Sequence, residues 1–586
     1  RLTAYLTDTD QPNQPLGEAA VEGAAENLFD VIDDLVTDLL GGLMTGPGGR
    51  LQKLAVGSSS SIDATKEYLI GEQLLRAGQY REAAAAYDRA VAIDSTFALA
   101  YYRKSVAAEW IDAADIRAVA DKAVQFADKL SQRDQNLLKA LRFRRHGETD
   151  KSEKILRDHL HTYPDEIEAL SQLGEIYFHE NPRVGRSTLE ARIPFEHLVE
   201  LEDGNLIAQI HLARLDAAEG KLDLLAQRAE LLAARAPDSE RAVEVEAIYA
   251  FATRDTARQT RVREKLSNSP WFYTFYAAHG VSRYARNVHG AADILDARSS
   301  NDPLLQFMVP ELLIARGKLS EYRQFMQSPN LVRNPTWDVT EAFILTSGVI
   351  NPERRELMDL RERVRRADPN DVRSSGFVRP PDDITVRFLQ FEIDFNVGLL
   401  SVWLDDEKEA RDVLDRLDAA DEFDGLGSIR NDAARSLEAE ILYRAGDREG
   451  ALAQLRQIQY QIPHSATVRP FTDGTRSRFL RSELEYELGD VETARNFLLG
   501  LDQSWSPLDM FVRAPVYERL GQIAEDRGDT EDAIRQYSLL LDQWRECDVE
   551  LIPRREEIRE RLQVLLGRST REPGELAVPA AASASS

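Results

Sequence analysis

The sequence contains one cysteine and no long apolar run. Cys547 is the only thiol among 586 residues, so no disulfide within the chain is possible. No stretch of eighteen apolar residues occurs, so no segment of the sequence is predicted to span a membrane. The chain opens on Arg1 rather than methionine and has no signal peptide, so we expect any targeting segment to lie upstream. Two locations stay open: the extracytoplasmic part of a membrane-anchored bacterial protein, or the bacterial cytoplasm.

The sequence also contains fewer basic than acidic residues. The formal net charge is −27, from 100 acidic and 73 basic residues. The basic runs Arg142–Arg145 and Arg363–Arg366 are interrupted by apolar residues at helical spacing, which is typical of a solvated helix face. Because binding to phosphate needs clustered lysine and arginine, we expect no nucleic-acid partner.

The common catalytic and metal-binding motifs are absent from the sequence. It has no Gly-x-x-x-x-Gly-Lys loop, no Gly-x-Ser-x-Gly, no His-Glu-x-x-His, and none of the protein-kinase motifs His-Arg-Asp or Asp-Phe-Gly. His159 and His161 are two residues apart, which places them on different faces of a helix. We therefore expect no enzymatic activity from this chain, no cofactor and no metal site.

What the sequence does contain is a recurring pattern of small residues and glycines. In its clearest copy the small residue Gly71 precedes a turn glycine, Gly78, by seven positions; Ala83, Tyr87 and Ala90 follow at fixed intervals. This is the spacing of a tetratricopeptide repeat, a pair of antiparallel helices of about 34 residues. One such hairpin cannot bury its apolar face alone, so the pattern predicts a stacked array.

The pattern recurs along the chain. Further copies are marked by Ala140 and Gly147, Ala213 and Gly220, Ala439 and Gly446, and Gly521 and Gly528, with weaker copies around Gly317, Gly398 and Gly489. Three prolines, Pro164, Pro237 and Pro463, each fall 17 residues after a turn glycine. A proline at that place is expected to end the second helix. The fold class is therefore predicted to be all-α, a right-handed TPR-like helical solenoid of about 12 to 14 hairpins.

The two ends differ from the array. Residues 1–45 contain two candidate strands, near residues 1–6 and 19–21, and one candidate helix, and are predicted to be the C-terminal remnant of an α/β domain. Residues 46–62 are interpreted as a linker and 63–567 as the solenoid. Residues 568–586 are rich in proline, alanine and serine, which predicts a disordered tail.

One insertion interrupts the frame. The next small residue after Gly174, Ala191, comes five positions later than the frame predicts, and Pro194 follows where it should bend the second helix. Either the insertion is simply an enlarged loop, or it contacts a ligand, because long loops often carry function. The second alternative makes four residues candidates for partner binding: His179, Asn181, Arg183 and Arg186.

The first helix of each hairpin should line the inner groove of the solenoid. On that basis the candidate partner-binding residues are Tyr68, Glu72 and Arg76 in the first repeat, His211 and Arg214 in the fourth, and Glu518, Gln522 and Glu525 in the last. Since only a minority of interface residues carry binding energy, most of these are expected to be plain solvated side chains.

Three stretches resemble segments of a group of large bacterial TPR proteins. They are Gly71–Tyr101, Gly528–Pro553 and Gly174–Ser187, which reads Gly-Glu-x-x-Phe-His-x-Asn-Pro-x-x-Gly-Arg-Ser. In that group the repeat region follows a serine/threonine kinase, a transcriptional-activator or a TolB-like domain, and residues 1–45 are similar to the end of the TolB-like domain. The resemblance implies the architecture; kinase activity is not implied, because the kinase motifs are missing here.

These features predict a scaffold or sensor arm of a bacterial signalling or regulatory protein, which binds a protein or peptide through the solenoid groove. One alternative is a self-assembling filament or surface protein, in which the N-terminal strand edge pairs with another copy. Another is the non-catalytic region of a serine/threonine kinase.

Overall fold

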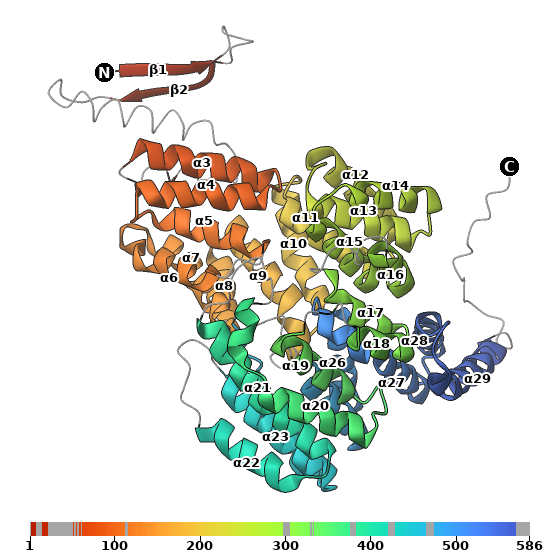
Figure 1. Ribbon diagram of the computed structural model, residues 1–586. Helices are drawn as coiled ribbons and strands as arrows, with labels where there is room; N and C mark the ends of the chain where they lie inside the picture. The colour runs from red at the N-terminus through yellow and green to blue at the C-terminus, as the bar shows by residue number, and fades with distance from the viewer. Residues whose placement is uncertain are drawn as a thin grey trace, which may run out of the picture.

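The computed structural model describes most of the chain. The described residues are 2–7, 15–21, 51, 54–55, 58–59, 61–111, 115–296, 305–328, 331, 333–374, 383–419, 428–463 and 474–569. Within them the fold is an all-α array of helical hairpins, preceded by one strand pair (Figure 1). The predicted N-terminal helix and the C-terminal tail beyond residue 569 lie outside the described residues.

The two N-terminal strands form an antiparallel ladder. β1 (Leu2–Thr7) pairs with β2 (Pro15–Val21), with Tyr5 opposite Glu18 and an irregularity between Leu6 and Thr7. The strands predicted near residues 1–6 and 19–21 are therefore present, and the second begins four residues earlier than predicted. Of the predicted linker, Leu51 and Ala55 are buried in the hydrophobic core of the N-terminal half.

The first part of the array consists of six hairpins. Their helices are α3 (Ile62–Arg76) and α4 (Tyr80–Ile93), α5 (Ala98–Glu109) and α6 (Ile116–Gln125), α7 (Gln132–Arg145) and α8 (Thr149–Thr162), α9 (Ile167–His179) and α10 (Arg192–Leu201), α11 (Leu206–Ala218) and α12 (Leu222–Arg235), α13 (Glu240–Ala252) and α14 (Thr256–Ser267). Short 3-10 helices are η3 (Ala127–Lys129), η4 (Asn181–Val184) and η5 (Thr188–Ala191).

Seven further hairpins and a closing helix complete the array. They are α15 (Trp271–Arg283) and α16 (Val288–Asp296), α17 (Met308–Ala315) and α18 (Leu319–Met326), α19 (Pro335–Leu345) and α20 (Arg354–Arg366), α21 (Asp383–Trp403) and α22 (Glu407–Ala419), α23 (Ile429–Arg444) and α24 (Arg448–Leu455), α25 (Thr475–Glu487) and α26 (Val491–Gln503), α27 (Arg513–Asp526) and α28 (Thr530–Gln543), then α29 (Ile552–Ser569). Here the 3-10 helices are η7 (Pro369–Ser374), η9 (Pro507–Val512) and η10 (Val549–Leu551). Thirteen hairpins among the described residues agree with the predicted 12 to 14.

In several hairpins the small residue of the first helix lies against an aromatic ring of the second helix. A Cβ on Gly71 would lie 2.5 Å from Tyr87 Cε1, and one on Gly174 would lie 2.5 Å from Phe195 Cε1. The first pair is 16 residues apart and the second 21, so the five extra residues of the insertion lie between the two helices. The frame predicted from the spacing is confirmed at both places.

The turn after the first helix needs left-handed backbone. Gly78 has φ +71°, and the same sign is found at Gly147, Gly220, Gly317, Gly446, Gly489 and Gly528. At three hairpins the turn residue is not glycine: Arg254 has φ 58°, Arg286 has φ 50° and Asp405 has φ 59°. Asp405 follows Gly398 by seven residues, so Gly398 is the small residue of its copy, packed close to Leu437, and not the turn.

Proline ends the second helix in two of the three predicted places. α8 and α12 stop shortly before Pro164 and Pro237. The prediction is wrong at Pro463, because α24 already ends at Leu455. The next residues are not helical beyond a turn at 456–457, Tyr460 has φ 52°, and the N–H groups of Gln459 and Tyr460 donate to the Asp432 carboxylate of α23, at 3.1 and 3.0 Å. The N–H groups of this segment thus bond to side-chain oxygens of α23 instead of the main-chain carbonyls that a longer α24 would offer.

The predicted bend at Pro194 is also wrong. α10 begins at Arg192, so Pro194 lies in its first turn, where the N–H groups have no acceptor within the helix. The inserted residues form η4 and η5 ahead of that helix.

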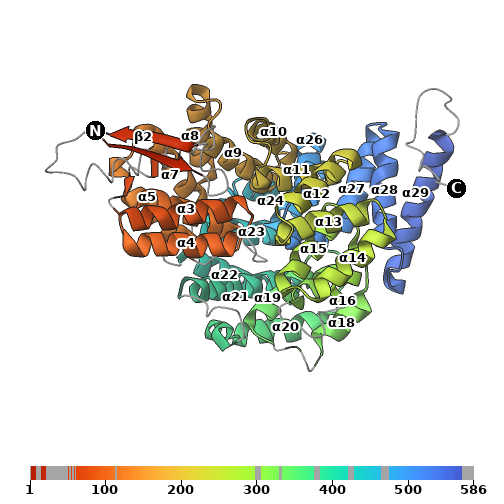
Figure 2. The same cartoon turned by 90° about the horizontal axis from the view of Figure 1, so that it is seen from above.

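The array curves until distant hairpins touch. Thr188 Oγ1 donates to Gln503 Oε1 over 2.9 Å, the Arg513 guanidinium donates to the Ser282 carbonyl over 2.7 Å, and Gln543 donates to the Ala315 carbonyl over 2.8 Å. The 3-10 helix η4, which precedes α10, packs against α26, and Figure 2 shows the blue α26 close to this part of the array. The C-terminal hairpins therefore cover part of the inner face of the preceding ones.

Candidate functional site

The inner face of the first repeat is largely covered. Tyr68 is buried between the rings of Tyr87 and Phe97, with centroids 5.7 and 5.3 Å away. Glu72 is buried as well; it accepts a 2.6 Å hydrogen bond from the Tyr87 hydroxyl and pairs with Arg103 at 2.8 Å. Arg76 is exposed. The prediction that Tyr68 and Glu72 face an open groove is wrong. Phe97, which immediately precedes α5 of the next hairpin, packs on Tyr68, and Arg103 of α5 pairs with Glu72.

The candidates of the last repeat are half-buried and engaged by α29. Glu518 pairs with Arg554 at 2.5 Å, and Glu525 pairs with Arg561 at 3.1 Å. Gln522 accepts a 2.6 Å hydrogen bond from Arg519. The closing helix thus occupies much of this face, and binding of a partner here stays a prediction.

The inserted segment is an internal contact rather than a free loop. Asn181 and Arg183 are buried, and Asn181 donates to the Ser187 carbonyl at 3.2 Å. Arg183 pairs with Glu180, and Arg186 pairs with Glu153 at 2.8 Å. Because η4 packs on α26, the enlarged-loop interpretation describes the geometry, and ligand contact by these residues stays a prediction.

His211 and Arg214, the candidates predicted in the fourth repeat, lie on α11 of the fifth hairpin, and both are buried. Arg214 holds Glu244 with two hydrogen bonds of 2.9 Å, and the exposure predicted for Arg214 and His211 is wrong. His211 instead meets another candidate, His179 of α9: their Nε2 atoms are 3.5 Å apart. Glu175, one helical turn before His179, completes the group, and its Oε2 lies 3.4 Å from His179 Nε2.

Glu175, His179 and His211 each offer a ligand atom, and these atoms lie within 4.8 Å of one another. Burial lowers the pKa of His211 to about 4, so the imidazole is neutral near pH 7. Burial raises the pKa of Glu175, but the two histidines outweigh it and hold that pKa below its usual range. Sequence reasoning missed this group because its members come from two hairpins, and the expectation of no metal site rested on local motifs alone.

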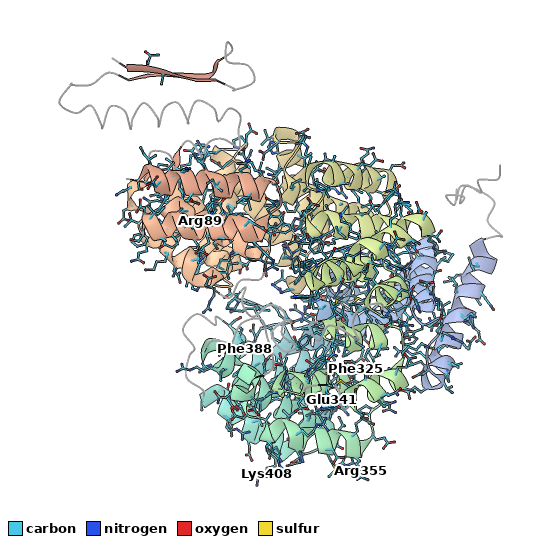
Figure 3. The ribbon with its side chains drawn as sticks, turned by 45° about the horizontal axis from the view of Figure 1, so that its top comes forward. Arg89, Phe325, Glu341, Arg355, Phe388 and Lys408 are labelled. Atoms are coloured by element: carbon cyan, nitrogen blue, oxygen red, sulfur yellow. The ribbon has the colours of Figure 1, made fainter. Side chains whose placement is uncertain are left out.

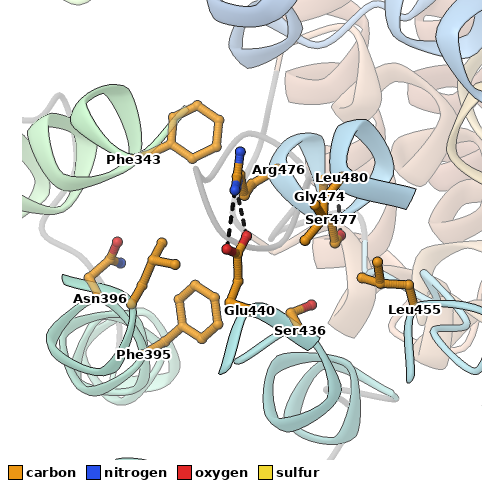
Figure 4. Close-up of a pocket in the computed structure, with 11 residues that line it drawn as sticks. Phe343, Phe395, Asn396, Ser436, Glu440, Leu455, Gly474, Arg476, Ser477 and Leu480 are labelled. Atoms are coloured by element: carbon orange, nitrogen blue, oxygen red, sulfur yellow. Dashed lines mark hydrogen bonds and ion pairs between the residues drawn. The ribbon is translucent and has the colours of Figure 1, made fainter. Parts of the chain in front are cut away.

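A second feature is a hollow on the inner side of the array. It is lined mainly from the first helices of four successive hairpins, with Leu455 of α24 added; its empty space of about 450 Å³ includes open solvent, and the enclosed part is about 20 Å³ (Figure 4). Phe343 belongs to α19, Phe395 and Leu399 to α21, Glu440 to α23 and Leu480 to α25. The prediction that first helices line the groove is therefore met here, but by residues that the sequence frame did not single out.

The hollow combines apolar walls with one ion pair. Arg476 reaches across from α25 and binds both carboxylate oxygens of Glu440, at 2.6 and 3.1 Å (Figure 4). The side chains of Asn396, Ser436 and Ser477 add polar groups to the wall. Because the charges neutralise each other, the chemistry of the hollow suits an uncharged, mainly apolar group with some hydrogen-bonding capacity.

The contact between the middle and the C-terminal hairpins is polar and buried. Asp502 accepts from Arg286 at 2.6 Å and from Arg513 at 3.2 Å. Burial opposes ionisation of Asp502, but the two guanidinium groups dominate and lower its pKa to about 2. Nearby Glu311 behaves in the opposite way: burial raises its pKa to about 8, against the pull of Arg283 and Arg513.

The two basic runs differ: the first is partly buried, whereas Arg365 and Arg366 of the second are exposed, as predicted for a solvated helix face. Arg144 and Arg145 are buried and share Glu109, so the solvated-face prediction is wrong for them. Arg363 pairs with Glu341 of α19, which Figure 3 shows within the array, whereas Arg355 and Lys408 project from its outer edge (Figure 3). Cys547 is half-buried, and burial raises the pKa of its thiol.

No protein-family model matches the chain, and no curated protein matches it. The solved structure of Naa15/Naa10 bound to HypK-THB contains a chain that aligns with 94% of this chain and 94% of its own length. The identity is 13% and the TM-score is 0.20, a superposition too loose to support an inference about partners or activity. Among the described residues, no helix is both long and apolar enough to cross a membrane.

Proposed function

We propose that this protein is a helical-repeat scaffold that binds a protein partner through the hollow between α19, α21, α23 and α25. The observation that carries the proposal is the convergence of four successive first helices on one open space. Repeat proteins use such concave surfaces for recognition, because each repeat adds side chains to one continuous face.

The chemistry of the hollow indicates what it would take. Phe343, Phe395, Leu399 and Leu480 offer apolar contact, while Asn396 and Ser477 can hydrogen-bond to main-chain groups. The occupant that we propose is a peptide segment of the partner that inserts an apolar side chain between the two phenylalanines. Burial of one large apolar side chain stabilises such a complex by about 1.5–3 kcal/mol.

A substitution that fills the hollow with a larger side chain tests this proposal. Peptides selected from a display library against the full chain would be measured by fluorescence anisotropy on the parent and on Ser436→Phe, which places a ring in the hollow. The matched control is Ser267→Phe, the same substitution on the exposed face of α14. We expect at least about tenfold weaker binding for the first variant only. Equal binding by both variants, with unchanged helicity, would contradict the proposal.

The finer role that we propose is recognition within a bacterial signalling or regulatory protein, with any catalytic activity supplied elsewhere. Its support is the sequence resemblance of Gly71–Tyr101, Gly174–Ser187 and Gly528–Pro553 to bacterial TPR proteins. On this proposal the chain itself neither binds ATP nor transfers phosphate. Autophosphorylation by the purified chain would contradict it.

The strand pair favours a second candidate, self-assembly. Among the described strands each has one hydrogen-bonded neighbour, so each offers a further edge. Pairing of β1 or β2 with another copy would link solenoids into larger assemblies.

A further inference from the structure

The group formed by Glu175, His179 and His211 comes from two consecutive hairpins. Glu175 and His179 are four residues apart on α9, so both side chains lie on one face of that helix. His211 lies on α11, which packs against α9. Two imidazoles and one carboxylate therefore meet where the fourth and fifth hairpins touch.

The spacing of the ligand atoms fits a tetrahedral ion. Zinc–nitrogen bonds of about 2.0–2.1 Å place neighbouring ligand atoms about 3.3 Å apart at the tetrahedral angle. The two imidazole Nε2 atoms are 3.5 Å apart, and His179 Nε2 lies 3.4 Å from Glu175 Oε2. The three ligand atoms all lie within 4.8 Å of one another, so the remaining pair must close by up to about 1.5 Å to share one ion.

The surroundings orient the His211 ring for this role. Its Nδ1 lies 2.9 Å from the Ile207 carbonyl and donates to it, which leaves the lone pair on Nε2 facing His179. Phe195 stacks on the same ring, with centroids 4.7 Å apart and planes at 14°. A backbone hydrogen bond on the second ring nitrogen is the usual support of a metal-bound histidine.

The carboxylate of Glu175 is short of hydrogen bonds. The residue is only 5% exposed, and its Oε1 has no hydrogen-bond partner among the described residues, the nearest histidine nitrogen being 3.6 Å away. A buried carboxylate oxygen without a donor costs free energy that a cation would recover. One guanidinium, Arg144, stands 3.6 Å from Oε2, but Glu109 engages it more closely.

An ion has a route to this group. The His179 side chain is 21% exposed, whereas the side chains of Glu175 and His211 are enclosed. On the same side the ring of Trp505, from the segment between α26 and η9, lies 6.0 Å from the His179 ring. The fourth position of a tetrahedral ion can thus be filled by water next to His179.

We propose that Glu175, His179 and His211 bind one Zn²⁺ ion, with water as the fourth ligand. Imidazole nitrogen and carboxylate together favour zinc over magnesium or calcium, which prefer all-oxygen sites. The ion links the fourth hairpin to the fifth beside the five-residue insertion, so it fixes the geometry of the contact with Trp505. This inference is independent of the peptide-binding hollow.

Metal content of the full, untagged chain tests the proposal. After loading with zinc and removal of excess, we expect one zinc per chain in the parent and in His161→Ala, an exposed histidine of α8. His179→Ala and His211→Ala should each lose at least nine-tenths of it. Cobalt bound in place of zinc should give the intense visible bands of a four-coordinate site in the parent and not in His179→Ala.

A second measurement covers the risk that His211→Ala does not fold. Because the His179 side chain is partly exposed, His179→Ala should keep parental helicity, and zinc should raise the thermal midpoint of the parent but not of this variant. A folded parent that retains no zinc after loading would overturn the proposal. Zinc retained by His179→Ala, or lost equally in His161→Ala, would overturn the zinc proposal as well. In that case the short distance between the two Nε2 atoms would reflect a shared proton and not a metal site.

Discussion

The small residue Gly71 offers a sharp test of how the hairpins are packed. In Gly71→Ala the new Cβ would lie 2.5 Å from Tyr87 Cε1 and 2.8 Å from both Cδ1 and Cζ. Carbon atoms in contact are about 3.5–4.0 Å apart, so the ring must retreat by about 1 Å. It cannot do so freely, because Tyr87 is fully buried and its hydroxyl is bound to Glu72 at 2.6 Å.

Overpacking of this kind costs about 1–3 kcal/mol, while replacing a helical glycine by alanine gains up to about 1 kcal/mol. The control Gly567→Ala isolates the second effect, since no atom lies within 4 Å of the Cβ added in α29. We expect hydrogen exchange of α3 and α4 to quicken in Gly71→Ala, and exchange of α29 to stay equal or slow down in Gly567→Ala.

A double-mutant cycle measures how much of this free-energy cost comes from the Tyr87 ring. Tyr87→Leu removes the ring, so Gly71→Ala should cost less in that background, with a coupling free energy of about 1–3 kcal/mol. A coupling near zero would refute the packing argument, because the cost would then not come from the ring.

Three further predictions address other parts of the molecule. Asp502→Asn should destabilise the protein by about 3–5 kcal/mol in denaturant unfolding, because it removes the negative charge between partly buried Arg286 and buried Arg513, whereas Asp158→Asn on the surface should change little. The raised pKa of Glu311, about 8 against an ordinary 4.5, means that the folded protein binds the extra proton, so this group's contribution is complete below about pH 4.5 and is lost as pH rises through 8. Unfolding midpoints measured from pH 5 to pH 8 should therefore fall more in the parent than in Glu311→Gln, and parallel curves would contradict the assignment. Tyr5→Pro should reduce any self-association seen by light scattering, since it removes a ladder donor from β1, and unchanged assembly size would argue against edge pairing.

The local frame of the repeats could be predicted from the sequence because each rule is local. A small residue opposite an aromatic ring, as at Gly71 and Tyr87, and a left-handed glycine such as Gly78 leave their spacing in the chain. The five-residue insertion could be located for the same reason. Arg254 and Asp405 show the limit, since the turn there uses residues that the pattern does not mark.

The candidate site could not be predicted because it depends on how neighbouring hairpins stack on one another. Nothing near Tyr68 or Arg214 in the sequence indicates that later helices cover them. The irregular segment before Pro463 depends on acceptors on Asp432 and Ser428, about thirty residues earlier. The histidines of the proposed zinc site are 32 residues apart, a separation that becomes a contact only through the stacking of hairpins.

The contact between distant hairpins has a consequence for the order in which the protein can be built. In an open array each repeat touches only its neighbours, so folding can follow synthesis from the first repeat onward. Here Met510 of η9 is part of the same hydrophobic cluster as Val243 and Leu312, and Arg513 binds the end of α15. Helices α13 and α17 therefore remain incompletely covered until η9 and α27 have been synthesised. A premature stop ahead of η9 would then expose apolar surface on these helices, far in sequence from the break.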